Sequence, residues 1–488
     1  MSISLLDVMT APELFGSEFS GASWAAWRTA LRAAFGLPME AAERGTFAAC
    51  TGREVPPTRP AEELWLIAGR RSGKSRIAAL VATYAACFRP YALARGERGV
   101  CMVLAADRQQ ARVVFRYVRG LLDTPLLRPL VERETRESID LTNGLSIEVH
   151  TASYRTVRGY TIVCAVLDEV AFWRSEDAAE PDVEVVNALR PALATTPGAL
   201  LVGLSSPYAQ RGLLYRMHQR YWAKDDPSVL IWRAPTAVMN PTIGRAVIER
   251  ARAEDPVAAA AEWDAEFRRD IESFLSREAV EACVVAGRRE LPPVPDTAYV
   301  AFCDPSGGAN DSMTLAIAHA EGRGDEARAV LDAVREVRPP FSPEAVVRDF
   351  AETVRAYGLA RIVSDRYAAG FHAELWEKQG IPHAPAEKPK SDLYRELLPA
   401  INSGRAELLD HGRLIGQLCA LERRTARGGR DSIDHPPGGR DDVANAVAGA
   451  VHLVLGRRPC GWEDLYGDNA QAAPGGADGA GAEVGVGA

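Results

Sequence analysis

Residues 68–75 read AGRRSGKS, a pattern that could bind the phosphates of a nucleotide. Gly73, Lys74 and Ser75 match the end of the motif G-x-x-x-x-G-K-[ST], and Ala68 replaces its first glycine. In such a loop the glycine lets the backbone approach the phosphates, the lysine neutralises their charge and the serine ligates Mg²⁺. The alternative is a turn that contains GKS by chance. The residues expected to bind ATP are Gly69, Arg70, Arg71, Ser72, Gly73, Lys74 and Ser75.

Two acids follow an apolar run in TIVCAVLDEVAFW, residues 161–173. Asp168 would hold Mg²⁺ through water, and Glu169 would position and deprotonate the water that attacks the γ-phosphate. A small-molecule kinase need not have the second carboxylate, so the pair favours hydrolysis. A strand end capped by two solvated acids is the simpler alternative.

Two further segments fit ATP hydrolysis. LLVGLSSPYAQRG, residues 200–212, is a strand with a polar end that could sense the γ-phosphate. In TASYRTVRGYT, residues 151–161, Arg155 or Arg158 could stabilise charge in the transition state, in cis or from a neighbouring subunit. Arg70 and Arg71 compete for that role. A surface salt bridge is the alternative for each arginine.

A second set of acids lies in the C-terminal half: Asp304 after YVAFC, Asp365 at the end of RIVSD, and Asp441 or Asp442 before the last helix. Such a cluster could hold two divalent cations, Mg²⁺ or Mn²⁺, about 3.5–4 Å apart, for phosphodiester cleavage. Asp442 is preferred because Asn445 would lie on the same helix face. Singly, each acid could instead cap a turn or a helix.

Neighbouring residues have weaker roles in this interpretation. Asp311 and Asp434 are possible supporting acids, and His435 is expected to be a loop residue rather than a ligand. RRTARGGR, residues 423–430, places four arginines near the last acids, where they could contact DNA phosphates. A plain solvated loop is the alternative.

Strands and helices must position these residues, and they alternate up to about residue 235. The expected strands are LWLIA, VCMVLAA, LSIEVHT, TIVCAVLD, ALLVGLSS and VLIWRAP, and WAAWRTALRAAFG reads as an amphipathic helix. This alternation predicts an α/β fold with a mainly parallel sheet and covering helices.

The C-terminal half has a different order of elements. After a charged, alanine-rich stretch and the proline-rich ELPPVPDT, we expect three strands, a helix, a fourth strand and a final helix, DDVANAVAGAVHLVL. That order is typical of an RNase H-like sheet, in which the first and fourth strands lie side by side. The predicted domains are a P-loop NTPase domain at 1–240, a helical linker at 241–296, an RNase H-like nuclease domain at 297–457 and a disordered Gly/Ala-rich tail at 458–488.

The composition of the chain restricts the classes of protein to which it could belong. The 488 residues carry a formal net charge of −8, so any contact with nucleic acid must use local basic patches. The eight cysteines form no C-x-x-C pair and several lie in apolar runs, which predicts buried thiols in a reducing compartment. No run is long enough for a membrane span, and the N-terminus lacks a signal peptide, so we expect a cytoplasmic protein.

Together these parts resemble the large terminase subunit of tailed bacteriophages. The resemblance covers about residues 20–457 and rests on GRRSGKS, CAVLDEVAFW, GLSSPYAQRG, CDPSGGANDSMTLAIAH and DHPPGGRDDVANAVAGA. It implies a motor that pumps double-stranded DNA into a procapsid by ATP hydrolysis and cuts concatemeric DNA. The implied partners are the portal protein, a small terminase subunit and further copies in a ring, and the implied location is the host cytoplasm, transiently at the portal vertex.

The resemblance also implies site residues. Lys74 and Ser75 would bind nucleotide, Glu169 would be the hydrolytic base, and Asp304, Asp365 and Asp442 would hold the nuclease metals. Arg158 is the expected trans-acting arginine. The chain departs from the family at Asn445, where a further Asp is frequent.

Two other functions fit parts of the sequence. A cellular helicase-nuclease or repair ATPase would share both sets of acids but should carry helicase motifs after residue 235, and none is found there. A nucleotide-binding assembly switch with a degenerate RNase H-like scaffold would bind ATP and cut nothing.

Overall fold

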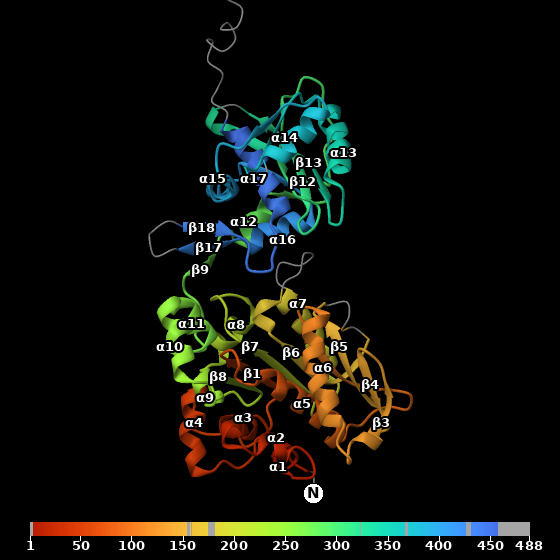
Figure 1. Ribbon diagram of the computed structural model, residues 1–488, viewed down its shortest axis with the longest axis vertical. Coiled ribbons are helices and arrows are strands. Elements are labelled where there is room, and N and C mark those ends of the chain that lie inside the picture. The colour runs from red at the N-terminus through yellow and green to blue at the C-terminus, as the bar shows by residue number, and fades with distance from the viewer. Residues whose placement is uncertain are drawn as a thin grey trace, which may run out of the picture. The chain divides into compact units, whose positions relative to one another are not determined.

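A computed structural model of the chain describes residues 3–153, 157, 159–173, 181–322, 324–366, 369–425 and 431–456. It contains two compact units: residues 1–281 with 411–441, and residues 282–410 with 442–488. Figure 1 traces both. Arg155, Arg158, residues 426–430 of the arginine-rich segment and the predicted tail at 458–488 lie outside the described residues.

The first unit is built on an eight-stranded sheet with the order β3-β4-β5-β2-β6-β7-β1-β8. The strands from β5 to β8 in this order are parallel, which confirms the predicted mainly parallel sheet. All six expected strands are present: β1 (Glu63–Ala68), β2 (Gly99–Ala105), β5 (Leu145–Thr151), β6 (Thr161–Asp168), β7 (Leu200–Ser205) and β8 (Val229–Ala234). The antiparallel strands β3 (Val131–Glu134) and β4 (Ser138–Leu141) were not expected, because they are short and largely polar.

Helices cover both faces of this sheet. The helices up to residue 262 are α1 (Leu5–Thr10), α2 (Gly16–Phe19), α3 (Ala25–Ala34), α4 (Ala41–Thr51), α5 (Lys74–Phe88), α6 (Arg108–Leu122), α7 (Pro181–Ala194), α8 (Gly212–Tyr221), α9 (Thr236–Met239), α10 (Arg245–Glu254) and α11 (Pro256–Glu262). Alternate side chains of β1 lie on opposite faces of the sheet and belong to different hydrophobic cores. Leu64 and Leu66 pack in the core that contains α3 and α5. Trp65 and Ile67 pack in the core that contains α7 and α8. A sheet buried on both faces requires the continuous apolar strands that the sequence contains.

Residues 411–441 pack with the first unit, although the sequence places them inside the predicted nuclease domain. After α16 (Gly412–Ala420), strands β17 (Glu422–Thr425) and β18 (Asp431–Asp434) form a small antiparallel sheet with β9 (Ile271–Ser273). Glu422 is fully buried and accepts hydrogen bonds from the Tyr208 hydroxyl at 2.9 Å, from Arg424 and from Arg211. The division therefore differs from the expected boundaries, because these contacts join residues far apart in sequence.

The second unit carries a seven-stranded sheet with the order β10-β16-β13-β12-β11-β14-β15. Strand β11 (Tyr299–Asp304) pairs antiparallel with β12 (Met313–Glu321), β12 pairs antiparallel with β13 (Arg328–Val337), and β11 pairs parallel with β14 (Ile362–Ser364). This is the predicted RNase H-like arrangement. The remaining elements are α12 (Arg277–Ala282), which spans the boundary, β10 (Val284–Val285), α13 (Pro343–Ala356), α14 (Ala369–Lys378), β15 (His383–Pro385), α15 (Lys390–Asn402), β16 (Ala406–Leu409) and α17 (Asp442–Leu455).

Close packing fixes α17 against this sheet. A Cβ atom at Gly449 would lie 2.3 Å from the ring of Phe302 on β11, so only glycine allows this approach. Among the helices within the described ranges, none combines the length and apolar character needed to cross a bilayer.

Candidate active sites

The predicted phosphate loop connects the end of β1 at Ala68 to the start of α5 at Lys74. Gly73 has φ +99°, a conformation that glycine adopts without strain. A Cβ atom at Gly69 would lie 2.2 Å from Thr236 Oγ1 and 2.7 Å from the Trp263 carbonyl oxygen. Both glycines are therefore required by the shape of the loop.

Side chains from two other segments, α3 and α9 with its C-cap residue, hold the loop carbonyls. Thr236 Oγ1 donates to the Arg70 carbonyl at 2.8 Å, Asn240 Nδ2 to that of Arg71 at 2.8 Å, and Trp27 Nε1 to that of Ser72 at 2.7 Å. The N–H of each peptide points opposite to its carbonyl. The N–H groups of the next residues, 71 to 73, thus point away from these donors and can bind an anion.

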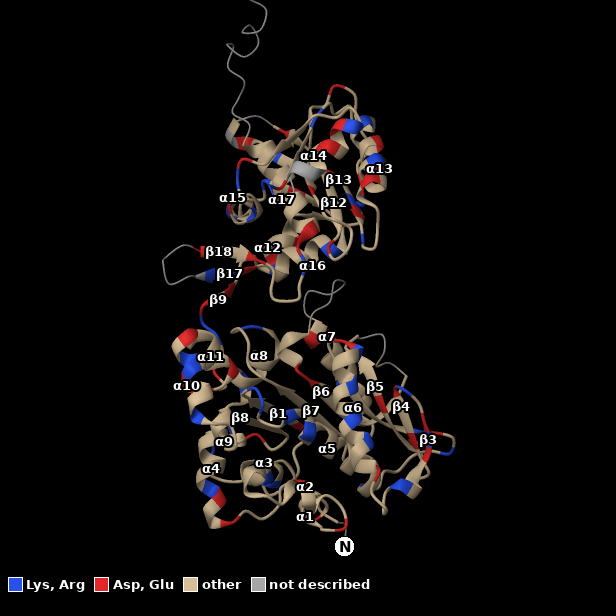
Figure 2. Cartoon of the chain, in the orientation of Figure 1, with Lys and Arg blue, Asp and Glu red and all other residues tan. Residues whose placement is uncertain are grey.

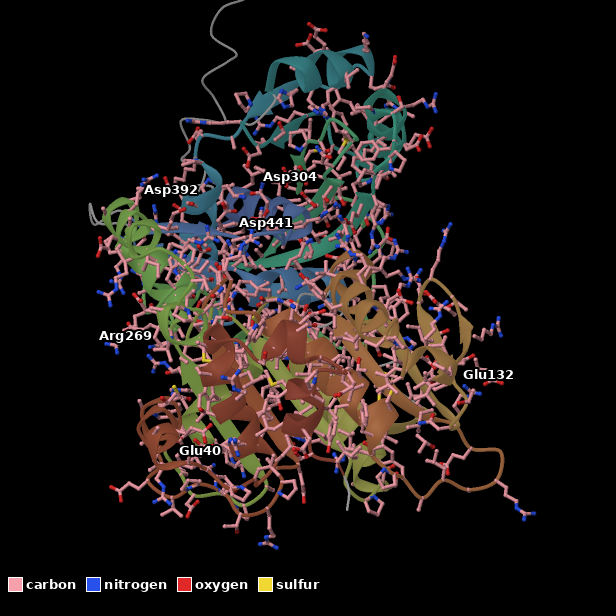
Figure 3. All side chains as sticks on the ribbon, turned by 60° about the horizontal axis from the view of Figure 1, so that its bottom comes forward. Glu40, Glu132, Arg269, Asp304, Asp392 and Asp441 are labelled. Carbon is pink, nitrogen blue, oxygen red and sulfur yellow. The ribbon has the colours of Figure 1, made fainter. Side chains whose placement is uncertain are left out.

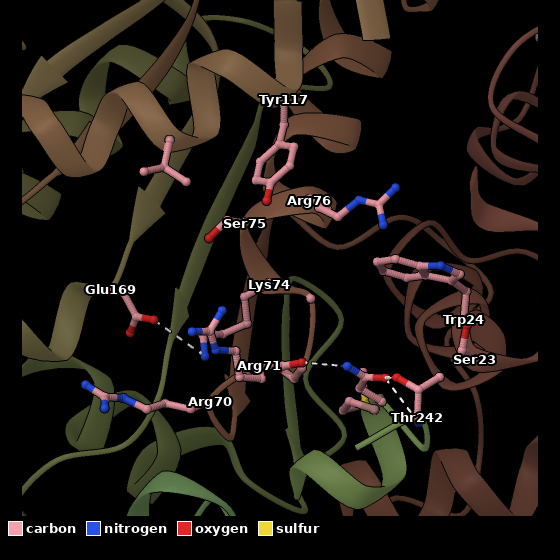
Figure 4. A pocket seen from close by; sticks show the side chains of 15 residues that line it. Ser23, Trp24, Arg70, Arg71, Lys74, Ser75, Arg76, Tyr117, Glu169 and Thr242 are labelled. Carbon is pink, nitrogen blue, oxygen red and sulfur yellow. Dashed lines mark hydrogen bonds and ion pairs between the residues drawn. The ribbon is translucent and has the colours of Figure 1, made fainter. Parts of the chain in front are cut away.

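A pocket of about 460 Å³ lies over this loop (Figure 4). The lining residues are Ser23, Trp24, Arg70, Arg71, Ser72, Gly73, Lys74, Ser75, Arg76, Val113, Tyr117, Glu169, Met239, Asn240 and Thr242. Most of the predicted nucleotide-binding residues thus share one pocket, whereas Gly69 and Asp168 do not line it.

The ends of β6 and β7 meet at the loop lysine. Lys74 Nζ donates to the carbonyls of Ala68 and Gly69 at 3.0 and 3.1 Å and to Ser206 Oγ at 2.9 Å, and it lies 3.5 Å from Glu169 Oε1 (Figure 4). Glu169 Oε2 accepts from Ser205 Oγ and from the Ser206 N–H, both at 3.0 Å. The polar end of β7 therefore positions the predicted base directly.

Asp168 has an environment that suits a cation. Its side chain is buried, and Oδ1 has no hydrogen-bond partner among the residues that the structure describes. Burial, together with the neighbouring Glu169 charge, raises the pKa of Asp168 to about 7, although Lys74 acts in the opposite direction. A Mg²⁺ ion with its water ligands would satisfy the oxygen and favour the charged form, so the residues present fit this ion.

Of the arginine candidates for transition-state stabilisation, two can be located. Arg70 and Arg71 line the pocket, and Arg70 pairs with Glu262 at 3.2 Å. Arg155 and Arg158 lie outside the described residues, so the predicted role of Arg158 stays a prediction.

In the second unit, two predicted metal ligands, Asp304 and Asp365, lie at the ends of the neighbouring strands β11 and β14. Cys303 on β11 and Ser364 on β14 are partners in the parallel register, and the Asp365 N–H donates to the Cys303 carbonyl at 3.2 Å. Asp304 and Asp365 follow these two residues directly, so their side chains start from the same sheet edge. Asp304 is labelled in Figure 3 and is the last residue of β11.

The first turn of the last helix, α17, lies at the same edge of this sheet. Asn445 Nδ2 donates to Asp365 Oδ2 at 2.9 Å, and Asn445 is buried. Asp442, also buried, lies one turn earlier on α17 and on the same helix face. Asn445 Oδ1 has no hydrogen-bond partner within the described ranges. Carboxylates and an unpaired amide oxygen are suitable surroundings for divalent cations and their water ligands, which Asp304, Asp365 and Asp442 would hold.

A separate group lies within the first unit, where ligand atoms of Asp434, His435 and Asp441 all lie within 4.8 Å of one another. His435 Nε2 is 3.9 Å from Asp434 Oδ1 and 3.9 Å from Asp441 Oδ1, and Nδ1 lies 2.9 Å from the Pro436 carbonyl oxygen. His435 is a loop residue, as expected, but it has two carboxylate neighbours. Asp441 lies near His435, and Asp442 stays the predicted third ligand at the α17 edge.

Solved structures that resemble this chain include large terminases of phages. They include the bacteriophage HK97 large terminase (18% identity, 81% of this chain and 91% of that chain, TM-score 0.37) and the large terminase of a thermophilic bacteriophage in complex with ADP (14%, 81% and 94%, TM-score 0.37). A third is the large terminase nuclease of thermophilic phage G20c with bound magnesium (17%, 37% and 97%, TM-score 0.32). No family model and no curated protein matches the chain. With identities and TM-scores this low, these likenesses do not assign an activity, and the assignment depends on the chain's own residues.

Sequence reasoning missed the residues that hold the loop. Thr236, Asn240 and Trp27 carry no motif, and Glu262 and Trp263 lie in the segment expected to be a linker. Their role in holding the loop can be recognised only from their contacts in the folded chain. Asn445 stood out in the sequence as a departure from the family pattern, and the structure connects it to Asp365.

Removing the Asn445 amide should weaken metal binding in the second unit. In Asn445→Ala, the Asp365 carboxylate loses the donor that orients it, and we expect Mn²⁺ affinity to fall about 10–100-fold, as for other residues that orient metal ligands. Mn²⁺ titration of the nucleotide-free protein would measure this. The control is Asn402→Ala, which removes an exposed amide at the end of α15. Equal Mn²⁺ affinity in the two folded variants would contradict the assigned role.

Proposed function

We propose that this chain is the large subunit of a viral DNA-packaging motor. ATP hydrolysis in the first unit would drive double-stranded DNA into a procapsid, and a two-metal endonuclease in the second unit would cut concatemeric DNA. The portal protein, a small terminase subunit and further copies in a ring are the proposed partners. The proposed location is the host cytoplasm, transiently at the portal vertex.

One observation carries this proposal: a pocket over the predicted phosphate loop, lined by Glu169, and acids at the edge of an RNase H-like sheet occur on one chain. Glu169 lies beside Lys74 and is held by Ser205 and Ser206, an arrangement that suits water activation next to a γ-phosphate. Asp304 and Asp365 share a sheet edge that Asn445 and Asp442 approach from α17. Energy from ATP and cleavage of phosphodiesters are the two chemistries that packaging needs.

In chemical terms, Mg²⁺ at Ser75 and Asp168 would neutralise phosphate charge when bound. The loop N–H groups and Lys74 would bind the phosphates, and Glu169 would accept the proton of the attacking water. In the second unit, Asp304, Asp365 and Asp442 would hold the divalent cations, which supply charge neutralisation during phosphodiester cleavage. Asn445 would keep Asp365 in one orientation.

Translocation on duplex DNA tests the motor. The full chain is mixed with linear double-stranded DNA that carries a triplex-forming oligonucleotide, and oligonucleotide release is followed with ATP or a non-hydrolysable analogue. We expect DNA to stimulate ATP turnover and ATP to drive release without separating the duplex strands. Strand separation on a forked duplex would instead favour a helicase-nuclease. ATP binding with no DNA-stimulated turnover would favour the assembly switch.

A further inference from the structure

The exposed face of α6 carries a row of arginines: Arg108, Arg112, Arg116 and Arg119. Spacings of four, four and three residues place them on one side of the helix. The row extends over about 16 Å at 1.5 Å per residue. The opposite side of α6, including Val114, Val118 and Leu122, is buried in the core. Figure 2 shows this basic row in blue.

Part of the row lines a hollow of about 420 Å³ together with the turn between β3 and β4. The lining residues are Gln109, Arg112, Phe115, Arg116, Arg119 and Arg136. None of them is acidic. Four guanidinium groups therefore converge on one concave surface, although the chain as a whole is acidic.

Nearby carboxylates neutralise only some of these arginines. Glu137 lies 3.5 Å from Arg108 and 3.8 Å from Arg112, and Glu134 pairs with Arg119. Across the residues that the structure describes, neither Arg116 nor Arg136 forms an ion pair. Exposed like charges at this spacing repel one another unless an anion binds.

We propose that this arginine face of α6, with Arg136, binds the phosphate backbone of double-stranded DNA. Guanidinium groups bind phosphate oxygens in bidentate geometry and suit backbone contact without base recognition. DNA carries one phosphate per about 3.4 Å of axis on each strand, so the row spans roughly four to five phosphates of one strand. A single phosphate group would engage only a small part of such a row.

The position of α6 gives this contact a consequence for ATP hydrolysis. Val113 and Tyr117 on the same helix line the nucleotide pocket. DNA bound along α6 thus contacts an element of the ATP site, and this contact stimulates ATP turnover. This inference depends on the proposed function, because it assumes that duplex DNA is the motor's substrate.

The test is duplex binding by the full chain, measured by fluorescence anisotropy over a range of salt concentrations. For the double variant Arg116→Ala/Arg136→Ala, we expect weaker binding to any sequence and a slope of log K against log salt that is smaller by about 0.9 for each arginine that contacts a phosphate. Basal ATP turnover should be unchanged, and DNA stimulation should be reduced. The control is Arg44→Ala/Arg348→Ala, which removes two exposed arginines from α4 and α13.

The outcomes separate this inference from the proposed function. If the wild type neither binds duplex DNA nor is stimulated by it, the proposed function fails. If the wild type binds and the α6 variant matches both the wild type and the control, the arginine face is not the DNA surface. If the α6 variant keeps its DNA affinity but loses turnover only in assembled rings, these arginines contact a neighbouring copy, which also overturns the inference.

Discussion

Glu169→Gln should reduce ATP turnover about 100–10,000-fold, the range expected when a general base is removed, while nucleotide binding persists. The carboxylate lies 3.5 Å from Lys74 Nζ, and its other oxygen accepts two hydrogen bonds from the end of β7. Glutamine preserves the size of the side chain and one acceptor oxygen but cannot take a proton from water. Single-turnover hydrolysis and nucleotide binding, measured on the same preparation, would separate the two steps.

Two companion variants make the result specific. Lys74→Ala should lose nucleotide binding as well as turnover, because the ammonium group that neutralises phosphate charge is gone. Glu254→Gln, at an exposed position at the end of α10, should retain wild-type turnover. Normal hydrolysis by Glu169→Gln would show that another group activates the water.

Asp304→Asn should eliminate metal-dependent DNA cleavage and leave ATP turnover intact. Asp304 shares a sheet edge with Asp365, and the loss of one charged ligand weakens the binding of both cations that such a site would hold. We expect cleavage of a supercoiled plasmid to fall by at least about 100-fold, since removing even an outer-shell partner costs about 10–100-fold. The plasmid assay is run with Mg²⁺ and with Mn²⁺.

The control for this experiment is Asp296→Asn, which makes the same chemical change at an exposed residue of the second unit. Asp296 has φ +61°, a conformation that asparagine tolerates, so the variant should fold. Cleavage that survives in Asp304→Asn would remove this residue from the site. An absence of cleavage by the wild type as well, with normal ATP turnover, would favour a scaffold role for the second unit.

Much of the fold follows from local patterns. The strands β1, β2, β5, β6, β7 and β8 are apolar runs that end in polar or small residues, and each was predicted from its own composition. The hairpin of β3 and β4 escaped prediction because β3, VERE, is mostly polar and the alternation of β4, SIDL, extends over only four residues. Its turn nevertheless supplies Arg136 to the basic face of α6.

The domain boundaries were harder to predict, because they depend on contacts between residues that are far apart in sequence. Residues 411–441 pack with the first unit through β9 and the buried Glu422, whereas the order of elements alone placed them in the nuclease domain. Leu418 and Leu421 are buried in the structure, and their apolar character alone does not show against which unit they pack.

The sequence by itself determined the residues on which the proposed chemistry depends: the predicted phosphate loop at 68–75, the acids at the ends of β6, β11 and β14, and the order of strands that carries them. These features depend on residue types at short spacings, which a linear chain displays directly. Only the tertiary structure decided which donors hold that loop, that Ser205 and Ser206 bind Glu169, and that Asn445 binds Asp365. Such contacts depend on how distant segments pack, and packing is a property of the whole fold rather than of any local pattern.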